Sequence, residues 1–272
     1  KRLLFAVIIV FSVAAVTFGQ ISWQPVSSTW GEYYKIVKTS DGKYLANSRA
    51  GNPSVVYQSN DLNVWTPLAV APPNAMYPAF LKEHTGKVLI GTESNGLYYT
   101  PNNGITWNPI AGFPASYGGP YDLVEDAANN LYAGTVNGGS PGVFKSVDGG
   151  TTWIQTGLEE AVDLEVVSET NQIYLIGGTS GKVWYSNNGT ASWNEVTGQP
   201  FSGSAVMVKH YGNYIFVFRN NGEIYVSTNS GLNWTYYSTI AISGTAVQWY
   251  NDAVILWNNV WWVSFMDKGL FR

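Results

Sequence analysis

The chain has 272 residues, a formal net charge of −4 at pH 7 and only 12% charged residues. A chain of this length can bury a core that needs no disulfides, and the scarcity of basic residues argues against nucleic acid as a partner. The absence of cysteine excludes a disulfide framework and a lipid anchor on an N-terminal cysteine.

Residues 1–19 have the pattern of a signal peptide. Two basic residues precede the apolar stretch Leu3–Val16, and small residues precede a plausible cleavage site before Gln20. A membrane anchor is the alternative, but the stretch is short for a span of about 20 residues. We therefore expect a secreted or periplasmic protein, of bacterial type, with no stable membrane span after signal removal. Its mature domain would comprise residues 20–272.

Tryptophan recurs along the mature chain at intervals of about 42 residues, which indicates a supersecondary unit copied in tandem. The repeated positions are Trp23, Trp65, Trp107, Trp153, Trp193 and Trp234.

Each complete unit contains three short runs of β-branched and aromatic residues before its tryptophan, and the residues after it form a fourth. Four short antiparallel strands per unit are typical of a propeller blade. A β-sandwich or an irregular all-β fold is the alternative, and the period disfavours both. The runs predicted as innermost strands are Lys35–Lys38, Ala79–Lys82, Asp122–Glu125, Leu164–Val167, Val206–Lys209 and Ala253–Trp257.

A turn motif ends at most of the tryptophans. A Ser or Thr is followed by an Asp or Asn, then by Gly, then by Trp. The Asp or Asn can accept backbone N–H groups, Gly supplies a positive φ, and the tryptophan buries a large ring. The motifs are Thr100–Trp107, Ser146–Trp153, Ser186–Trp193 and Ser227–Trp234, with a shorter version at Ser59–Trp65.

This motif, best kept in SVDGGTTW (Ser146–Trp153), resembles the Asp-box, or BNR, repeat. That repeat occurs in β-propellers such as sialidases, sortilin-type receptors, xyloglucanase-type glycoside hydrolases and photosystem II assembly factors. The resemblance covers nearly the whole chain after residue 20, and it implies a fold rather than an activity. It also implies peripheral, structural roles for Ser146, Asp148, Gly150 and Trp153, and for Trp65, Trp107, Trp193 and Trp234. Ligands would bind on the opposite face, around the central channel.

The segment around Trp23 has no preceding strands of its own except the signal peptide. Three predicted strands at the other end, from Ala253 onward, lack a fourth. Pairing the two ends would close the ring, so we expect six blades, with the N-terminal strand completing the last one. The alternative is a fragment, cut within a repeat, of a propeller with seven or more blades or with a further C-terminal domain.

The loops around the channel mouth supply the candidate ligand-binding residues. The positions just before the predicted inner strands are Tyr34, Pro78, Tyr121, Asp163, Ala205 and Asp252, with Tyr33 and Tyr77 one position earlier. The loops after the second strands carry Arg49, Glu93, Arg219 and Asp267. Tyrosines and charged groups together can bind a sugar or a peptide, and we select Tyr34, Tyr77, Tyr121, Arg49 and Arg219. The alternative is an ordinary rim without a common ligand.

Two enzyme classes can be compared with the charged residues that each of them needs. The family pattern of sialidases needs three arginines on the substrate carboxylate. After residue 19 only Arg49, Arg219 and the last residue, Arg272, remain, without an Arg-Ile-Pro motif, so a sialidase is disfavoured.

Xyloglucanase-type hydrolases use two facing carboxylates. Asp163 and Asp252 are the candidate pair, with Asp122 as a substitute. The chain is much shorter than those tandem-propeller enzymes, and none of their longer motifs is found.

Other chemistry has little support. The two histidines, His84 and His210, follow inner strands in turns, and no Cys/His cluster, phosphate loop or nucleophile elbow occurs. We expect no metal and no cofactor.

The sequence thus predicts an exported, monomeric Asp-box β-propeller that acts as a binding or scaffold module for carbohydrate or protein. The alternative is a glycoside hydrolase of the xyloglucanase type or, with less support, the sialidase type. An assembly factor for a membrane protein is a third hypothesis, but the arginine-rich patch that would favour it is missing.

Overall fold

The computed structural model describes most of the chain between residues 25 and 271. The described residues are 25–27, 33–48, 55–72, 78–92, 96–113, 116, 118–136, 141–156, 158, 161–177, 180–201, 203, 205–240, 254–257, 260–265 and 269–271. The expected signal peptide, Trp23 and the mouth residues Tyr77, Arg49 and Asp252 lie outside them.

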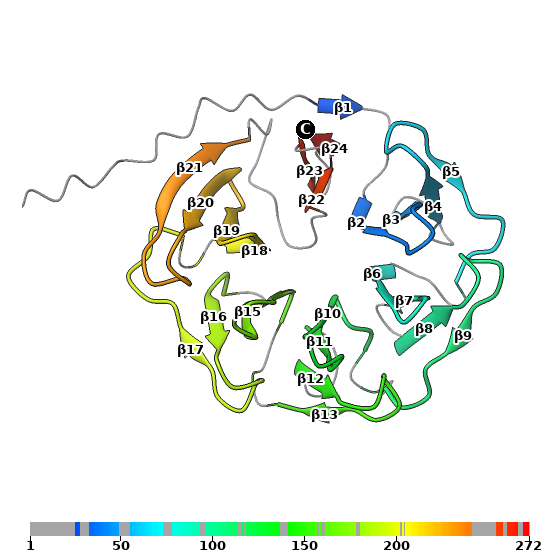
Figure 1. Cartoon of the computed structure of the whole chain (residues 1–272), viewed down its shortest axis with the longest axis horizontal. Coiled ribbons are helices and arrows are strands. Elements are labelled where there is room, and N and C mark those ends of the chain that lie inside the picture. Colours follow the sequence, from blue (N-terminus) through cyan, green and yellow to red (C-terminus); the bar gives the residue numbers. More distant parts are fainter. Residues whose placement is uncertain are drawn as a thin grey trace, which may run out of the picture.

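Five four-stranded antiparallel sheets, here called blades 1 to 5, stand around a centre (Figure 1). The innermost strands are β2 (Tyr33–Lys38), β6 (Pro78–His84), β10 (Asp122–Glu125), β14 (Asp163–Val167) and β18 (Ala205–Tyr211). The second strands are β3 (Tyr44–Ser48), β7 (Lys87–Thr92), β11 (Leu131–Thr135), β15 (Gln172–Ile176) and β19 (Tyr214–Arg219). The third strands are β4 (Val56–Ser59), β8 (Gly96–Thr100), β12 (Gly142–Ser146), β16 (Val183–Ser186) and β20 (Glu223–Ser227). The outer strands are β5 (Thr66–Pro67), β9 (Asn108–Pro109), β13 (Ile154–Gln155), β17 (Asn194–Glu195) and β21 (Thr235–Thr239).

The expected count of six blades needs a correction. The chain builds five blades from four consecutive strands each, not six. One further sheet is composite, with the order β1-β24-β23-β22, and joins β1 (Pro25–Ser27) to β22 (Val254–Trp257), β23 (Val260–Phe265) and β24 (Gly269–Phe271). In it Pro25 lies opposite Phe271, which is the pairing of the two ends that the sequence suggested. A fragment of a larger propeller is consistent with this arrangement.

The second strands form the buried middle layer of the blades. Every residue of β11 and β15 is buried, because each of these strands is covered by neighbouring blades on both faces. Three of the five inner strands carry an irregularity at their start, between Tyr33 and Lys35, Pro78 and Phe80, and Ala205 and Met207. β10 and β14 pair in regular register from their first residue. This difference decides where the channel carboxylates lie.

In each of the five blades the Ser or Thr hydroxyl of the turn motif donates to the Asp or Asn Oδ1 and accepts from a main-chain amide. In blade 3, the Ser146 hydroxyl accepts from Gly150 N at 2.9 Å and donates to Asp148 Oδ1 at 2.8 Å. Asp148 Oδ1 also accepts from Thr152 N at 2.8 Å. Gly150 has φ +89°, the left-handed conformation that a glycine adopts without strain. The motif is thus a self-contained hydrogen-bonded turn.

The motif tryptophans fill the seams between consecutive blades. Trp153 of blade 3 packs edge to face on Phe113, which follows blade 2, with 5.3 Å between the ring centroids. Trp234 of blade 5 packs on Phe201 in the same way, with 5.0 Å between the centroids. These two rings therefore join their own blade to the one before it, through aromatic and apolar burial.

Candidate functional site in the central channel

Charged side chains gather where the inner strands meet, on strands that otherwise look apolar. They come from all five blades: Lys35 on β2, Lys82 on β6, Asp122 and Glu125 on β10, Asp163 and Glu165 on β14, and Lys209 on β18. Asp122, Asp163 and Lys209 are buried. Buried charges are costly unless they are paired and hydrogen-bonded, so their partners define what this site can do.

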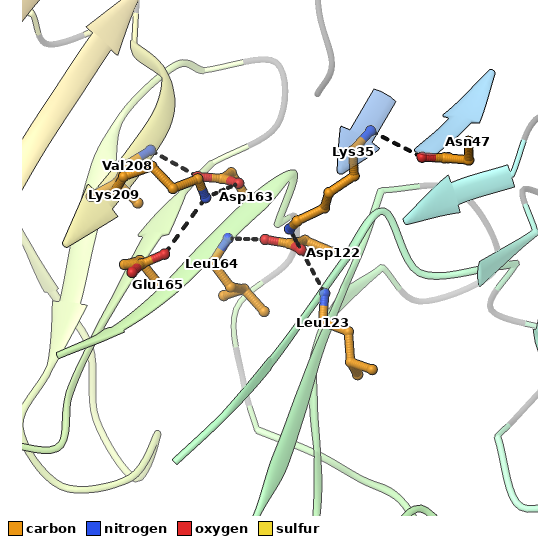
Figure 2. A network of polar contacts seen from close by, with 9 residues as sticks. All are labelled: Lys35, Asn47, Asp122, Leu123, Asp163, Leu164, Glu165, Val208 and Lys209. Atoms are coloured by element: carbon orange, nitrogen blue, oxygen red, sulfur yellow. Dashed lines mark hydrogen bonds and ion pairs between the residues drawn. The ribbon is translucent and has the colours of Figure 1, made fainter. Parts of the chain in front are cut away.

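Asp122 is fully buried, and each of its oxygens has a partner (Figure 2). Oδ1 pairs with the Lys35 ammonium and accepts from Leu123 N at 2.7 Å. Oδ2 accepts from Leu164 N at 2.9 Å, on the inner strand of the next blade. Lys35 belongs to blade 1 and Asp122 to blade 3, and blade 2 stands between them. This ion pair therefore reaches across the centre of the ring.

Asp163 repeats the arrangement one blade further on (Figure 2). Its Oδ2 accepts from Val208 N of blade 5 at 2.7 Å. The Lys209 ammonium lies 2.9 Å from Oδ1 and 3.1 Å from Oδ2. Each aspartate thus joins its own inner strand to the main chain of the following blade.

A second group of charges lies further along the same strands. Lys209 also lies 3.6 Å from Glu165, which accepts from the His210 amide at 3.1 Å. Between blades 2 and 3, Glu125 lies 2.7 Å from His84 Nδ1 and 3.8 Å from the Lys82 ammonium. The lysines thus come from blades 1, 2 and 5 and the carboxylates from blades 3 and 4, and each of the four carboxylates has a lysine ammonium within 4 Å.

The environments of the two aspartates move their pKa values in opposite directions. Burial acts to raise the pKa of Asp122, but the ammonium groups of Lys35 and Lys209 outweigh it and hold this pKa below its usual value. Burial, together with the Asp122 carboxylate, raises the pKa of Asp163 to about 7 despite Lys209. Proximity of like charges makes one of two carboxylates retain its proton, which is the pattern here.

Burial also raises the pKa of Glu165 and lowers the pKa of the Lys82 ammonium. For Lys209, burial acts in the same downward direction, but Asp163, Glu165 and Asp122 outweigh it, and the pKa of this lysine is raised. Lys209 is therefore held as an ammonium ion by three carboxyl groups.

The structure describes the side chains of only two of the predicted ligand-binding residues. Tyr121 is buried directly before β10, and its amide donates to Gly134 O at 2.8 Å. Arg219, at the end of β19, is paired with Glu223. Tyr34 lies on β2, but its side chain is outside the described residues, as are Tyr77 and Arg49. The structure therefore does not test these five residues as a joint ligand site.

Of the predicted carboxylates, the structure brings Asp122 and Asp163 into one network. Asp252 lies outside the described residues, so the Asp163–Asp252 pair stays a prediction. The sequence alignment set Asp163 against Tyr121, and this was wrong by one residue. On the second strands, Asp122 pairs with Gly134 and Asp163 pairs with Ile176, and these two partners occupy corresponding positions in their strands. Asp122 is therefore the residue equivalent to Asp163.

Sequence reasoning missed the lysines Lys35, Lys82 and Lys209. They stood at the ends of apolar runs and were counted as strand residues. A usable signal was present, since a charged residue recurs within the inner-strand runs of successive units. Within the described residues there is no group of three or more His, Cys, Asp or Glu side chains that could hold a metal ion. In the same residues, no helix has the length and apolar character needed to cross a membrane.

Comparison with known proteins places the fold more firmly than the activity. No protein-family model matches the chain. A xyloglucanase from Paenibacillus sp is 23% identical over 223 residues, which cover 65% of this chain and 20% of that enzyme. A xyloglucanase of family GH74 from Xanthomonas campestris superposes with a TM-score of 0.60 and 17% identity over 85% of this chain and 43% of the enzyme.

A different enzyme superposes equally well. A catalytically inactive variant of virginiamycin B lyase from Staphylococcus aureus has a TM-score of 0.62 and 15% identity, covering 92% of this chain and 98% of the lyase. At such identities the likeness shows a shared β-propeller fold and no shared activity. The chain also spans only about a fifth of the length of the Paenibacillus relative.

Proposed function

We propose that this chain is a carbohydrate-binding propeller in which the channel charges hold the blades together and do not cleave a substrate. One observation carries the proposal. Asp122 and Asp163 are buried, and each is engaged by a lysine and by a main-chain amide of the next blade. A carboxylate so occupied has no free oxygen with which to attack a sugar or to protonate a glycosidic bond.

The ligand class is inferred from the curated relatives. Their names identify them as xyloglucanases, so we propose a β-glucan chain such as xyloglucan as the ligand. The turn motifs support a structural, Asp-box type of repeat. Residues 1–19 support export to the outside of the cell or to the periplasm, with 20–272 as the mature domain.

A glycoside hydrolase is the second candidate, and one observation favours it. The opposite pKa shifts of Asp122 and Asp163 are those of a general acid beside an ionised carboxylate. Such a pair needs access to substrate, and both carboxylates are buried. We therefore rank it below the binding module.

The test combines binding with turnover. The protein is run in native gels containing xyloglucan and is also incubated with xyloglucan while new reducing ends are counted. We expect retardation in the gel, no reducing ends, and unchanged retardation for Asp163→Asn. Reducing ends that disappear in Asp163→Asn would replace the binding module by the hydrolase. The absence of both retardation and turnover would overturn both candidates.

A further inference from the structure

A cavity of about 600 Å³ opens between blades 2 and 3, on the side of the ring where the turn motifs lie. It is lined by the apolar or aromatic side chains of Leu89, Tyr99 and Ile110, by His84 and Lys87, and by the turn residues Asp148–Thr151. We call it the blade 2–3 groove. The channel mouth, where the sequence predicted ligand binding, is at the other end of the inner strands, because β6 begins at the mouth and ends at His84.

His84 is held in one orientation and presents one nitrogen to this groove. It is 7% exposed, and its Nδ1 lies 2.7 Å from the Glu125 carboxylate. The carboxylate can only accept, so Nδ1 carries a proton, and Nε2 of the neutral ring is an acceptor. A Cβ atom placed on Gly149 would lie 3.8 Å from Nε2, which fixes this nitrogen beside the turn at the groove rim. Among the described residues Nε2 has no hydrogen-bond partner.

Tyr99 provides an aromatic surface with an unused hydroxyl. Its ring lines the groove, and the Lys87 ammonium lies 4.9 Å from the ring centroid. Within the described part of the chain, neither the Tyr99 hydroxyl nor the Lys87 ammonium has a hydrogen-bond or ion-pair partner. Lys87 is exposed, so it can move aside or bind a ligand from above the ring.

We propose that the blade 2–3 groove binds a sugar ring of a neutral oligosaccharide. This inference rests on the proposed carbohydrate binding and assigns it a place. The Tyr99 ring can contact the C–H face of a sugar, and the groove offers an acceptor at His84, a donor at Lys87 and the Tyr99 hydroxyl. Such mixed groups match sugar hydroxyls, which both donate and accept.

The charges around the groove favour a neutral ligand over an ion. Among the lining residues Lys87 carries a positive charge and Asp148 a negative one, and Glu125 lies behind the His84 imidazole. The Asp148 carboxylate is already engaged by Ser146 and Thr152, and hydrogen bonds, chiefly from Thr152, lower its pKa to about 2, so it stays ionised. A negatively charged ligand would meet this fixed charge.

A second hollow at the turn motif of blade 1 lacks these features. It has a volume of about 360 Å³ and is lined by polar residues and one valine, with no aromatic side chain. Its residues are Lys43, Gln58, Ser59, Asn60, Asp61, Val64 and Thr66. The turn motif alone therefore does not create the site, and Tyr99 and His84 distinguish the groove.

The test uses matched pairs of variants and xyloglucan oligosaccharides in calorimetric titration. Tyr99→Phe removes the hydroxyl and keeps the ring, and Tyr185→Phe makes the same change at the equivalent position of blade 4. His84→Gln removes the imidazole, and His210→Gln does so for the histidine that pairs with Glu169. We expect Tyr99→Phe and His84→Gln to weaken binding about three- to tenfold each, the usual effect of one lost hydrogen bond. The two control variants should bind like the wild type.

The outcomes separate this inference from the proposed function. Wild-type binding that survives both Tyr99→Phe and Tyr99→Ala unchanged would overturn the groove and leave carbohydrate binding intact. Absence of binding by the wild type would overturn both. Because His84→Gln also removes a partner of Glu125, its unfolding midpoint is measured. If it is destabilised, the two Tyr99 variants decide.

Discussion

At the scale of single residues, the turn motif of blade 4 departs from the others. Its glycine comes one residue early, at Gly189, so Thr190 stands where the other full-length motifs have glycine. Thr190 has φ +78°, a conformation that is strained for a β-branched residue. In three of the other motifs the indole of the tryptophan donates at 3.0 Å to the carbonyl of this position, whereas the buried Trp193 Nε1 has no hydrogen-bond partner in the part of the chain that the structure describes.

We predict that Thr190→Gly stabilises the protein by about 1 kcal/mol, because glycine adopts a positive φ without steric cost. The measurement is the midpoint of urea unfolding. The reverse change in blade 3, Gly150→Thr, serves as the control and should destabilise by a similar or larger amount. An unchanged or lower midpoint for Thr190→Gly would show that the turn is not strained.

At the scale of elements, the two channel aspartates connect the inner strands of neighbouring blades. Asp122 bonds to blade 4 and Asp163 to blade 5, each through a main-chain amide. The bonds depend on regular register at the starts of β10 and β14, which places an aspartate side chain opposite an amide of the next blade. In β2, β6 and β18 the register shifts at this point.

We predict that Asp122→Leu costs about 3–5 kcal/mol, since it leaves the Lys35 ammonium and the Leu164 amide without their acceptor. Adding Lys35→Met should recover more than about 1 kcal/mol of that loss, because no buried charge is then left unpaired. The less buried pair Lys182–Glu195 is the control, and Lys182→Met should cost less than about 1 kcal/mol. Chemical unfolding of the wild type, of these three variants and of Lys35→Met alone measures these differences. Additive effects of the two channel substitutions would contradict the coupling.

These elements also mark the limit of what the sequence predicts. Alternating apolar residues and turn residues are local signals, and they gave the strands and the turns of the blades correctly. Such patterns do not fix the pairing register between neighbouring strands, so Asp163 was aligned with Tyr121 although its register on the second strand is that of Asp122. The role of Lys209 was missed for another reason. Its partner Asp163 lies 46 residues earlier, and nothing local to a lysine reveals a distant carboxylate.

At the scale of the whole molecule, the channel network couples protonation to the stability of the ring. Asp163 has a folded-state pKa of about 7 against an ordinary value of 3.8. Between these values the folded protein keeps a proton that the unfolded chain releases. The free energy of unfolding contributed by this group is therefore fully present below about pH 4 and is lost as the pH rises toward 7.

We predict that the wild type loses stability, relative to Asp163→Asn, as the pH is raised from about 4 to 7. The asparagine cannot titrate, so the difference between the two unfolding curves isolates Asp163 from the other channel groups. Asp122 acts in the opposite sense, because its pKa is lowered and its contribution is lost as the pH falls. Thermal unfolding of the wild type and of Asp163→Asn at several pH values measures this difference. Parallel curves for the two proteins would show that Asp163 is ionised throughout.

The ion pair between Lys35 and Asp122 also has a consequence for the order of folding. It joins residues 87 positions apart and skips the blade between them. Contacts of such long sequence separation form only after the intervening chain has closed into a loop. The first blade thus cannot reach its final environment until the third has folded into the ring. During synthesis, the Lys35 ammonium would stay hydrated until β10, which carries Asp122, has been made and has folded. The centre of the ring would therefore be completed late.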